Sequence, residues 1–364
     1  MINKLAILIF KLFLYPVVYL RRKKPSPGKE IKSLLLVNTT GIGDTILSTP
    51  AWRALRNKFP QAYISLLVHK RRREVVVNNP LVDNIISYRK FIDFWRIVRE
   101  LRRLNIDAAI IFHGNDPDIL PIVFLSGARE IIGYRHRTRL PYLLTHPLAK
   151  LPGHFIKAQM GLAGTLGGKD DNLKPVFYLT ERERKKAGLF FEEKGLTGKF
   201  IVGILPGAGR PYKRWPAERF AAVANHFLKR PEARVIIFGS RAEEPLTRKV
   251  ASLCQNKVIL TAGSLDLREA SALMERLDLF ITNDSGPLHI AQSLGVPTVA
   301  LFGPTDPAGL LPLGENGLLK IVKKDVTCQP CRTKECRYPF CLEQISTEEV
   351  IKAAQELIHE NSAQ

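Results

Sequence analysis

A polar turn between an apolar run and a helix has the composition of an anion-binding site. Residues 283–286 (Asn-Asp-Ser-Gly) follow the apolar residues 279–281 and precede Pro287, which fits a first helical turn because its missing N–H would be unpaired there anyway. Unpaired backbone N–H groups and the positive end of the helix dipole point toward such a turn. We therefore expect a phosphorylated ligand to bind at this turn.

A second polar turn follows the next apolar run. The helix stops at Gly295, and the run 297–303 leads into residues 304–307 (Pro-Thr-Asp-Pro). Two successive parallel strands would present their carboxyl ends at one crevice, where open α/β sheets bind ligands. The two turns together favour a ligand site in the second half of the chain.

The first half opens with a strand, a glycine-containing loop and a helix. Residues 32–38 predict a buried strand, 39–44 the loop with Gly41, Gly43 and Asp44, 45–59 a helix ended by Pro60, and 62–68 the next strand. This order is a βαβ unit at the start of a doubly wound domain. The third glycine of the dinucleotide-binding fingerprint is missing, so we do not infer NAD binding.

Further polar residues follow two strands of the second half. Residues 206–216 (Pro-Gly-Ala-Gly-Arg-Pro-Tyr-Lys-Arg-Trp-Pro), which contain Gly207 and Lys213, come after the strand predicted at 200–205. Glu243 and Glu244 come after a strand predicted at 234–240. An acidic residue at such a place commonly binds ribose hydroxyls. The sequence does not decide between the two glutamates, and we choose Glu243.

Three stretches, residues 41–60, 206–216 and 278–307, resemble the motifs of glycosyltransferase family 9, the ADP-heptose:lipopolysaccharide heptosyltransferases. The resemblance spans roughly residues 32–355. It implies an α/β protein of the GT-B fold class, with two facing Rossmann-like doubly wound domains. The domains we expect are a membrane-surface segment and linker at 1–30, an acceptor domain at 31–175, a nucleotide-sugar domain at 176–345 and a C-terminal helix at 346–364.

The resemblance also implies an inverting transfer of heptose from ADP-heptose to the Kdo or heptose of the lipopolysaccharide inner core. Asp44 would be the base on the acceptor hydroxyl, and Lys213 would bind the donor phosphates. The remaining donor-side residues are expected to be Gly207, Glu243, Asp284, Ser285, Gly286 and His289. We expect Asp284 to order its turn. No Asp-x-Asp pair is suitably placed for a donor-bound metal, so we expect neither an obligatory metal nor a cofactor.

A formal net charge of +21 predicts an anionic partner. Arginines are concentrated in residues 69–139, the half expected to hold the acceptor, and guanidinium groups pair well with phosphate and carboxylate. We expect Gly41, Gly43, Arg71 and Arg137 on the acceptor side. The chain has no zinc-finger or aromatic-rich RNA-binding motif, so we expect no nucleic-acid partner.

The N-terminal residues 5–20 are apolar apart from Lys11 and precede the basic residues 21–24 (Arg-Arg-Lys-Lys). This stretch is interrupted and is shorter than the roughly 20 residues of a membrane span, and it lacks a small-residue cleavage site. It fits a helix lying in an anionic membrane surface, and alternatively a helix packed on the domain. We expect a cytoplasmic protein that is peripheral on the inner face of the cytoplasmic membrane.

Four cysteines lie within a short segment near the C-terminus, and they are weak candidates for a zinc site: Cys328, Cys331, Cys336 and Cys341. Their spacing differs from that of a zinc ribbon, and the alternative is that all four are reduced.

Other functions remain open from the sequence. A related family 9 enzyme could use another nucleotide sugar, and a non-catalytic protein could bind lipopolysaccharide or membrane with the same fold. A nucleic-acid binder would depend on charge alone and bind with a steep salt dependence.

Overall fold

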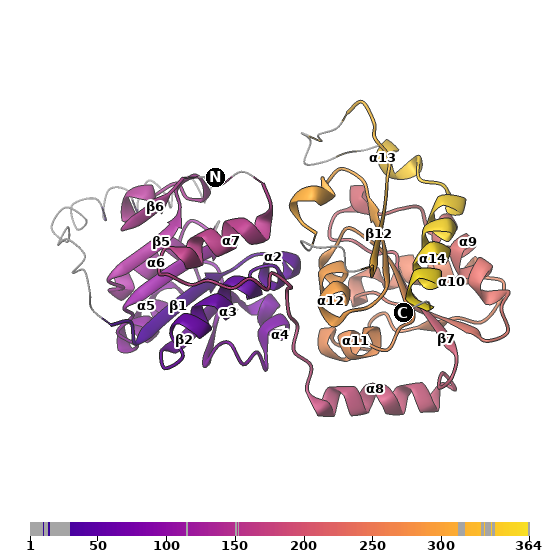
Figure 1. Cartoon of the computed structure of the whole chain (residues 1–364), viewed down its shortest axis with the longest axis horizontal. Helices are drawn as coiled ribbons and strands as arrows, with labels where there is room; N and C mark the ends of the chain where they lie inside the picture. The colour runs from indigo at the N-terminus through magenta and orange to yellow at the C-terminus, as the bar shows by residue number, and fades with distance from the viewer. Residues whose placement is uncertain are drawn as a thin grey trace. The chain divides into compact units, whose positions relative to one another are not determined.

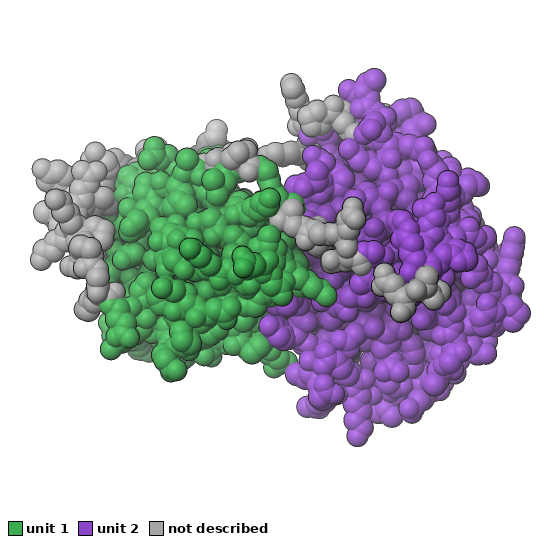
Figure 2. Space-filling view, viewed as in Figure 1, with its two compact units in different colours: residues 1–175 green, residues 176–364 purple. Residues whose placement is uncertain are grey.

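The computed structural model describes Phe10, Leu14, and residues 30–113, 116–149, 151, 153–311, 317–328, 331, 336 and 339–362. The chain divides into two compact units, residues 1–175 and 176–364 (Figure 2). Each unit holds one six-stranded parallel sheet covered by helices (Figure 1). No helix in these described ranges is long and apolar enough to cross a membrane.

The sheet of unit 1 has the order β3-β2-β1-β4-β5-β6. Its strands are β1 (Ser33–Asn38), β2 (Tyr63–His69), β3 (Asn84–Tyr88), β4 (Ala108–His113), β5 (Glu130–Tyr134) and β6 (His146–Leu148). All five pairings are parallel. The order places β1 beside β4, where the chain changes its direction of winding, and ligands of such sheets bind at that point.

The helices of unit 1 are α2 (Ile42–Ile46), α3 (Thr49–Lys58), α4 (Arg73–Val76), α5 (Phe94–Arg103), α6 (Ile119–Ser126) and α7 (Phe155–Gly164), with single 3-10 turns η1 (Lys70–Arg72), η2 (Arg135–Arg137) and η3 (Pro141–Leu143). Helix α3 packs with α7, and α5 packs with α6. Leu35 and Val37 of β1 join the buried cluster of α5 and α6. Because strand side chains alternate, the fully buried Leu34 and Leu36 point to the opposite face.

The sheet of unit 2 has the order β12-β11-β10-β7-β8-β9, which is the winding of unit 1 read from the other edge. Its strands are β7 (Phe200–Leu205), β8 (Ala233–Ile237), β9 (Ile259–Leu260), β10 (Leu279–Asn283), β11 (Thr298–Phe302) and β12 (Leu319–Lys323). Here β7 and β10 are the neighbours at the change of winding. The carboxyl ends of these two strands carry the polar turns at residues 206–216 and 283–286.

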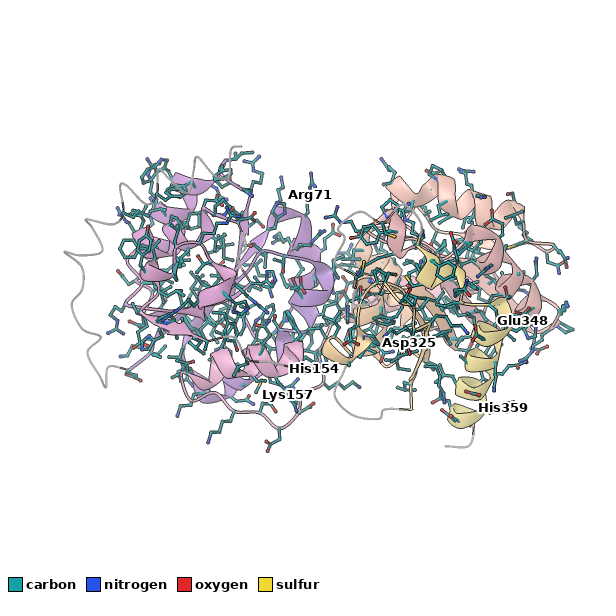
Figure 3. All side chains as sticks on the ribbon, turned by 90° about the horizontal axis from the view of Figure 1, so that it is seen from above. Arg71, His154, Lys157, Asp325, Glu348 and His359 are labelled. Atoms are coloured by element: carbon teal, nitrogen blue, oxygen red, sulfur yellow. The ribbon has the colours of Figure 1, made fainter. Side chains whose placement is uncertain are left out.

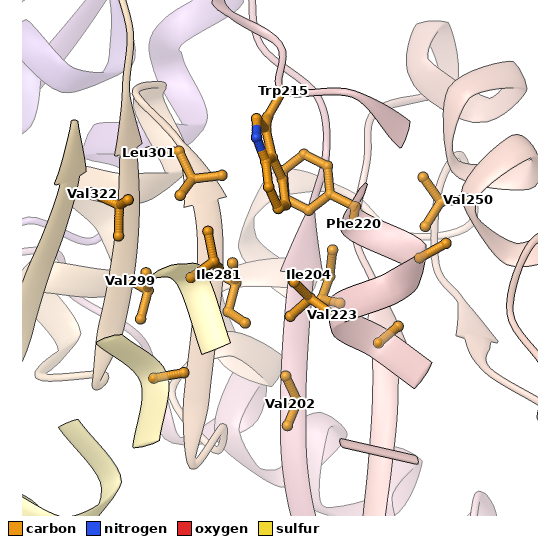
Figure 4. Packing of buried hydrophobic residues seen from close by; sticks show 14 of the residues in the cluster. Val202, Ile204, Trp215, Phe220, Val223, Val250, Ile281, Val299, Leu301 and Val322 are labelled. Carbon is orange, nitrogen blue, oxygen red and sulfur yellow. The ribbon is translucent and has the colours of Figure 1, made fainter. Parts of the chain in front are cut away.

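The helices of unit 2 are α8 (Glu181–Glu193), α9 (Ala217–Leu228), α10 (Glu244–Ser252), α11 (Leu267–Met274), α12 (Gly286–Leu294), α13 (Phe340–Glu343) and α14 (Thr347–Ser362), with η4 (Pro211–Lys213), η5 (Arg241–Glu243) and η6 (Pro307–Gly309). One face of the sheet packs against Trp215 and Phe220, whose rings meet edge to face at 5.0 Å (Figure 4). Helix α14 contributes Val350, Ala354 and Leu357 to the same cluster, so the last helix is part of the core of unit 2.

The helix expected at residues 45–59 is two helices in the structure, α2 and α3. Pro50 has no N–H to give to the carbonyl of Ile46, which accepts instead from the Thr49 hydroxyl at 2.7 Å. The Ser48 hydroxyl donates to the Asp44 carbonyl at 2.7 Å and satisfies the end of α2. As a result, Asp44 lies in a short helix and not in the loop that we expected.

Helices α8 and α11 are joined by an ion pair with little solvent exposure. Thr180 caps α8 in a reciprocal arrangement with Glu183, and Arg268 of α11 donates to the Glu183 carboxylate at 2.8 Å. The Arg268 guanidinium is the main reason that the pKa of Glu183 is lowered to about 2 from its ordinary 4.5. The charged pair therefore stabilises unit 2 above pH 4.5, and this contribution is lost as the pH falls toward 2.

We predict that Glu183→Gln lowers the free energy of unfolding by roughly 1–3 kcal/mol at neutral pH, because charge-assisted hydrogen bonds are lost while a glutamine can still close the cap. Urea unfolding at several pH values measures the effect, which must shrink as the pH falls below 4.5. The control is Glu181→Gln in the same turn, where the carboxylate is 90% exposed and the change is expected to be small. A loss of unfolding free energy that does not depend on pH would contradict the electrostatic explanation.

Candidate functional site

In unit 2 a lysine and an aspartate meet at the carboxyl end of the sheet. Asp284 directly follows β10, and Lys213 ends η4, in the connection between β7 and α9. The Lys213 Nζ lies 2.6 Å from Asp284 Oδ2, and the aspartate side chain is only 8% exposed. We expected Asp284 to order its own turn. In the structure its carboxylate also fixes the position of the lysine ammonium, and its ordering of the turn stays a prediction.

Asn283 joins the two loops that carry this pair. Its side chain is fully buried; Oδ1 accepts a hydrogen bond from the Trp215 N–H at 3.0 Å, and Nδ2 donates to the Pro206 carbonyl at 2.9 Å. Asn283 is not among the site residues predicted from the sequence. A signal for it was available, because an amide directly after an apolar strand is placed to bond the neighbouring loop.

The start of α12 offers further hydrogen-bond donors. Ser285 is the N-cap residue, with an extended backbone (φ −151°), and its side chain does not cap the helix. Among the described residues, its buried Oγ atom has no hydrogen-bond partner. Gly286 begins the helix, and the first backbone N–H groups of any helix lack an intrahelical partner. His289, one turn further along α12, is buried. A hydroxyl and backbone N–H groups beside a lysine can bind an anion.

Gly207 and Glu243 lie against each other at the ends of β7 and β8. A Cβ atom on Gly207 would be 2.1 Å from the Glu243 carboxylate, so a larger residue here would displace the Glu243 side chain. The other Glu243 oxygen accepts from the Ser240 N–H at 2.9 Å. Glu244 bonds Arg248 within α10 instead. Of the two glutamates, Glu243 is thus the one beside the Gly207 loop, and its contact with ribose stays a prediction.

In unit 1 the Asp44 carboxylate lies over the N-cap of α2. A Cβ atom on Gly41, the N-cap residue, would be 3.3 Å from Asp44 Oδ2, and Gly43 lies between the two in the helix. The Asp44 backbone is tied to β1, because its carbonyl accepts from Asn38 Nδ2 at 3.4 Å. The carboxylate is therefore held near the end of β1.

His113 and Arg137 complete this group from the ends of β4 and β5. The charge of Asp44 acts on both residues. Burial lowers the pKa of His113, and the nearby Arg137 lowers it further while Asp44 opposes the shift. The net lowering makes the imidazole neutral at neutral pH. We left His113 out of the predicted site because a lone histidine in a sequence has no distinguishing signal.

Arg137 is held by aromatic and carbonyl contacts. Its guanidinium donates to the Phe112 carbonyl at 2.8 Å and lies over the rings of Tyr134 and Phe155, at 5.5 Å and 5.4 Å from their centroids. Burial lowers the pKa of Arg137. Arg71, labelled in Figure 3, follows β2 in η1, where its N–H donates to His69 Nδ1. The structure records no interaction between Arg71 and Asp44, both of which are described.

The cysteines do not form a recognisable metal centre in the described part of the chain, where no group of three or more potential ligands converges. None of the four candidates forms a disulfide. Burial raises the pKa of the Cys341 thiol, and the charges of Cys328 and Cys336 add to this effect. Whether the four cysteines bind zinc stays a prediction.

We predict that Asn283→Leu lowers the free energy of unfolding by roughly 2–4 kcal/mol, because the buried Trp215 N–H and Pro206 carbonyl both lose a partner. Urea unfolding measures the loss. The matched control is Asn225→Leu, which also removes two side-chain hydrogen bonds, to Leu253 and Gln255, but at a more exposed place. Water can replace those bonds, so the control should lose less than about 1 kcal/mol. Equal losses in both variants would show that the buried hydrogen bonds of Asn283 stabilise the fold no more than exposed ones do.

The chain matches the model of glycosyltransferase family 9 (heptosyltransferase) over residues 94–341. Lipooligosaccharide heptosyltransferase 2 of Campylobacter jejuni (serotype O:2) is 35% identical over 44% of this chain, which spans about half (52%) of that relative's length. Lipopolysaccharide heptosyltransferase 3 of Escherichia coli K12 is 26% identical over 88% of this chain and 96% of its own length.

Solved structures agree with the fold. A family 9 glycosyltransferase from Veillonella parvula is 26% identical, with a TM-score of 0.79 over 92% of this chain and all of its own. The E. coli ADP-heptose lipopolysaccharide heptosyltransferase II is 22% identical, with a TM-score of 0.76 over 91% of this chain and 99% of its own. The predicted GT-B fold class is confirmed by this likeness. With the match of the family model to more than half of its residues, the chain belongs to glycosyltransferase family 9, the heptosyltransferase family.

Proposed function

We propose that this chain transfers heptose from ADP-heptose to a Kdo or heptose residue of the lipopolysaccharide inner core, with inversion at the anomeric carbon. The observation that carries the proposal is the Lys213–Asp284 pair beside the start of α12, at the change of winding in unit 2. A fixed ammonium and free helix N–H groups suit the diphosphate of a nucleotide sugar. The names of the similar proteins above supply the sugar and the acceptor class.

The proposed reaction is a single displacement. The Asp44 carboxylate takes the proton of the acceptor hydroxyl, and the hydroxyl oxygen forms a bond to the anomeric carbon as the bond from that carbon to ADP breaks. ADP leaves with the electron pair of that bond, and Lys213 together with the N–H groups of Ser285 and Gly286 stabilises its charge. Attack on the face opposite to the leaving group inverts the anomeric carbon.

Binding residues on each side have separate tasks in this proposal. On the donor side, Gly207 lets the backbone approach the phosphates, Glu243 binds the ribose, and Asp284 and His289 support the turn. On the acceptor side, Arg137 and Arg71 bind the phosphate or carboxylate groups of the lipid core. Neutral His113 is near Asp44, where it can donate a hydrogen bond to the acceptor.

We place the protein in the cytoplasm, associated with the inner face of the cytoplasmic membrane, because a nucleotide sugar and a lipid-anchored acceptor meet there. The surplus of basic residues supports attraction to anionic lipids. Two alternatives are decided by the same assay: a related transferase that uses another nucleotide sugar, and a non-catalytic binder of lipopolysaccharide.

We predict that Asp44→Asn lowers the acceptor-dependent release of ADP from ADP-heptose by roughly 10²–10⁴-fold, because an amide cannot take the hydroxyl proton. The assay uses the purified chain with a Kdo-bearing lipid A acceptor. The control is Asp171→Asn, an exposed aspartate before α8, which should retain full activity. Undiminished release by Asp44→Asn would refute the role of Asp44, and no release by the native chain with any ADP or UDP sugar would favour the non-catalytic alternative.

We predict that Lys213→Met lowers kcat/KM by roughly 10²–10³-fold and weakens ADP binding, because fixed positive charge at the diphosphate is lost. Calorimetry of ADP binding and the transfer assay measure the two effects. The control is Lys257→Met. Lys257 is an exposed lysine just before β9, at the amino ends of the strands of the same sheet. Equal ADP affinity of Lys213→Met and the native chain would show that Lys213 does not bind the donor phosphates.

A further inference from the structure

Two large apolar side chains stand in water at the start of α5. Ile92 is 72% exposed and Trp95 is 61% exposed, the highest values for large hydrophobic residues in the described part of the chain. Burial of large apolar side chains is favourable, so their exposure forgoes a substantial gain in stability. Large apolar side chains that are exposed next to each other indicate an interaction surface.

A strained turn holds Ile92 outward. Phe91 has a positive φ of 60°, and the Ile92 N–H donates to the Lys90 carbonyl at 2.7 Å, which closes a three-residue turn of the unfavourable hand. The fully buried Asp118 sustains the turn by accepting from the Phe91 N–H at 2.7 Å and from the Tyr88 hydroxyl. Such backbone strain is unfavourable, and it is found most often at functional sites.

Positive charge surrounds the two apolar side chains. Residues 89–103 contain six basic and two acidic residues, which gives a formal charge of +4. Both acids already have basic partners, because Asp93 pairs with Arg89 and Arg96, and Glu100 pairs with Arg96. Exposed Arg99 and Arg103 make no ion pair with any residue that the structure describes. An anionic surface is the partner that this charge fits.

Two described residues of the N-terminal segment, Phe10 and Leu14, contact unit 1 at α5. The Phe10 ring stacks on Phe94 at 5.6 Å, and Phe94 meets Trp95 edge to face at 5.1 Å. Leu14 is buried in the cluster of α5 and α6. The other residues of the predicted membrane-surface stretch at 5–24 lie outside the described residues. Contact of this segment with the membrane stays a prediction.

We propose that Ile92, Trp95, Arg99 and Arg103, which we call the α5 surface, dock unit 1 on an anionic bilayer. Ile92 and Trp95 enter the interface between headgroups and acyl chains, where tryptophan is favoured, and the two arginines lie against lipid phosphates. The proposal deepens the membrane association proposed above but does not depend on the transfer chemistry.

The chain carries its own probe for this surface. All three tryptophans lie in the described residues, and Trp52 and Trp215 are buried while Trp95 is exposed. The test mixes the full chain with vesicles of phosphatidylethanolamine and phosphatidylglycerol, and in parallel with vesicles of phosphatidylcholine. We expect co-sedimentation with the anionic vesicles, a blue shift of tryptophan emission and protection from acrylamide quenching. Sedimentation without a change at Trp95 would overturn the proposal.

Variants separate the apolar and the charged contributions. Ile92→Ser/Trp95→Ser should weaken partition onto anionic vesicles roughly tenfold or more, and Arg99→Glu/Arg103→Glu should weaken it about tenfold or more at low salt. The matched controls on α8 are Leu189→Ser, at a residue 55% exposed, and Arg182→Glu/Lys185→Glu, at two exposed basic residues. Both controls should partition like the native chain. Equal losses in variants and controls would overturn the proposal.

Two further readouts separate docking on lipid from damage to the active site and from self-association. Transfer to a water-soluble, delipidated acceptor should be unchanged in the α5 variants, while transfer to acceptor in vesicles should fall. A loss with both acceptors would indicate damage to the active site and refute a separate docking surface. Self-association of the native chain without lipid, with Trp95 protected, would overturn the proposal and identify a second copy as the partner instead.

Discussion

The parallel pairing of every strand is the constraint on which the rest of this structure depends. A parallel strand cannot follow its neighbour through a tight turn, so each connection crosses over the sheet. All carboxyl ends then meet at one edge, and the change of winding opens a gap between neighbouring connections there. Both units share this order, with β1 beside β4 in unit 1 and β7 beside β10 in unit 2. The polar turns that follow these strands therefore lie at this edge.

In unit 2 hydrogen bonds and an ion pair within the protein fix the groups at this edge. The buried amide of Asn283 bonds both ends of the loop at residues 206–216, through Pro206 and Trp215, and Trp215 also donates from its ring to the Ile345 carbonyl. Lys213 is oriented by Asp284 at 2.6 Å. A charge that is already in position needs no reorganisation when negative charge develops on a leaving group, and this is the main source of electrostatic catalysis.

In unit 1 the balance of charges around Asp44 depends on burial. Arg137 is held by two aromatic rings and a carbonyl group, so its guanidinium stays close to the carboxylate without forming a direct ion pair in the described structure. His113 is neutral because burial penalises its charged form. The fixed cation of Arg137 and the neutral imidazole of His113 are thus the charged and polar neighbours of the Asp44 carboxylate. The basic and apolar surface at α5 is a separate element of the same unit.

Local sequence patterns determined much of this protein. The strand, glycine turn and helix order, the stop of α12 at Gly295, and the stretches containing Asp44 and Lys213 could all be recognised because they depend on residues a few positions apart. The family resemblance rests on the same short stretches. The break between α2 and α3 was also a local effect, at Ser48 and Pro50, but the helical spacing of apolar residues concealed it.

Only the tertiary structure decided which of these groups meet. Lys213 and Asp284 are 71 positions apart, and Asn283 bonds the loop at residues 206–216 across a similar separation. His113 lies near Asp44 because β4 pairs with β1. Strand order is not encoded in any short window of residues, since parallel pairing is set by the packing of whole helices across the sheet. Exposure of Ile92 and Trp95 likewise follows from a turn held by Asp118, which lies far along the chain. The sequence therefore determined the kinds of groups present, and packing determined their partners.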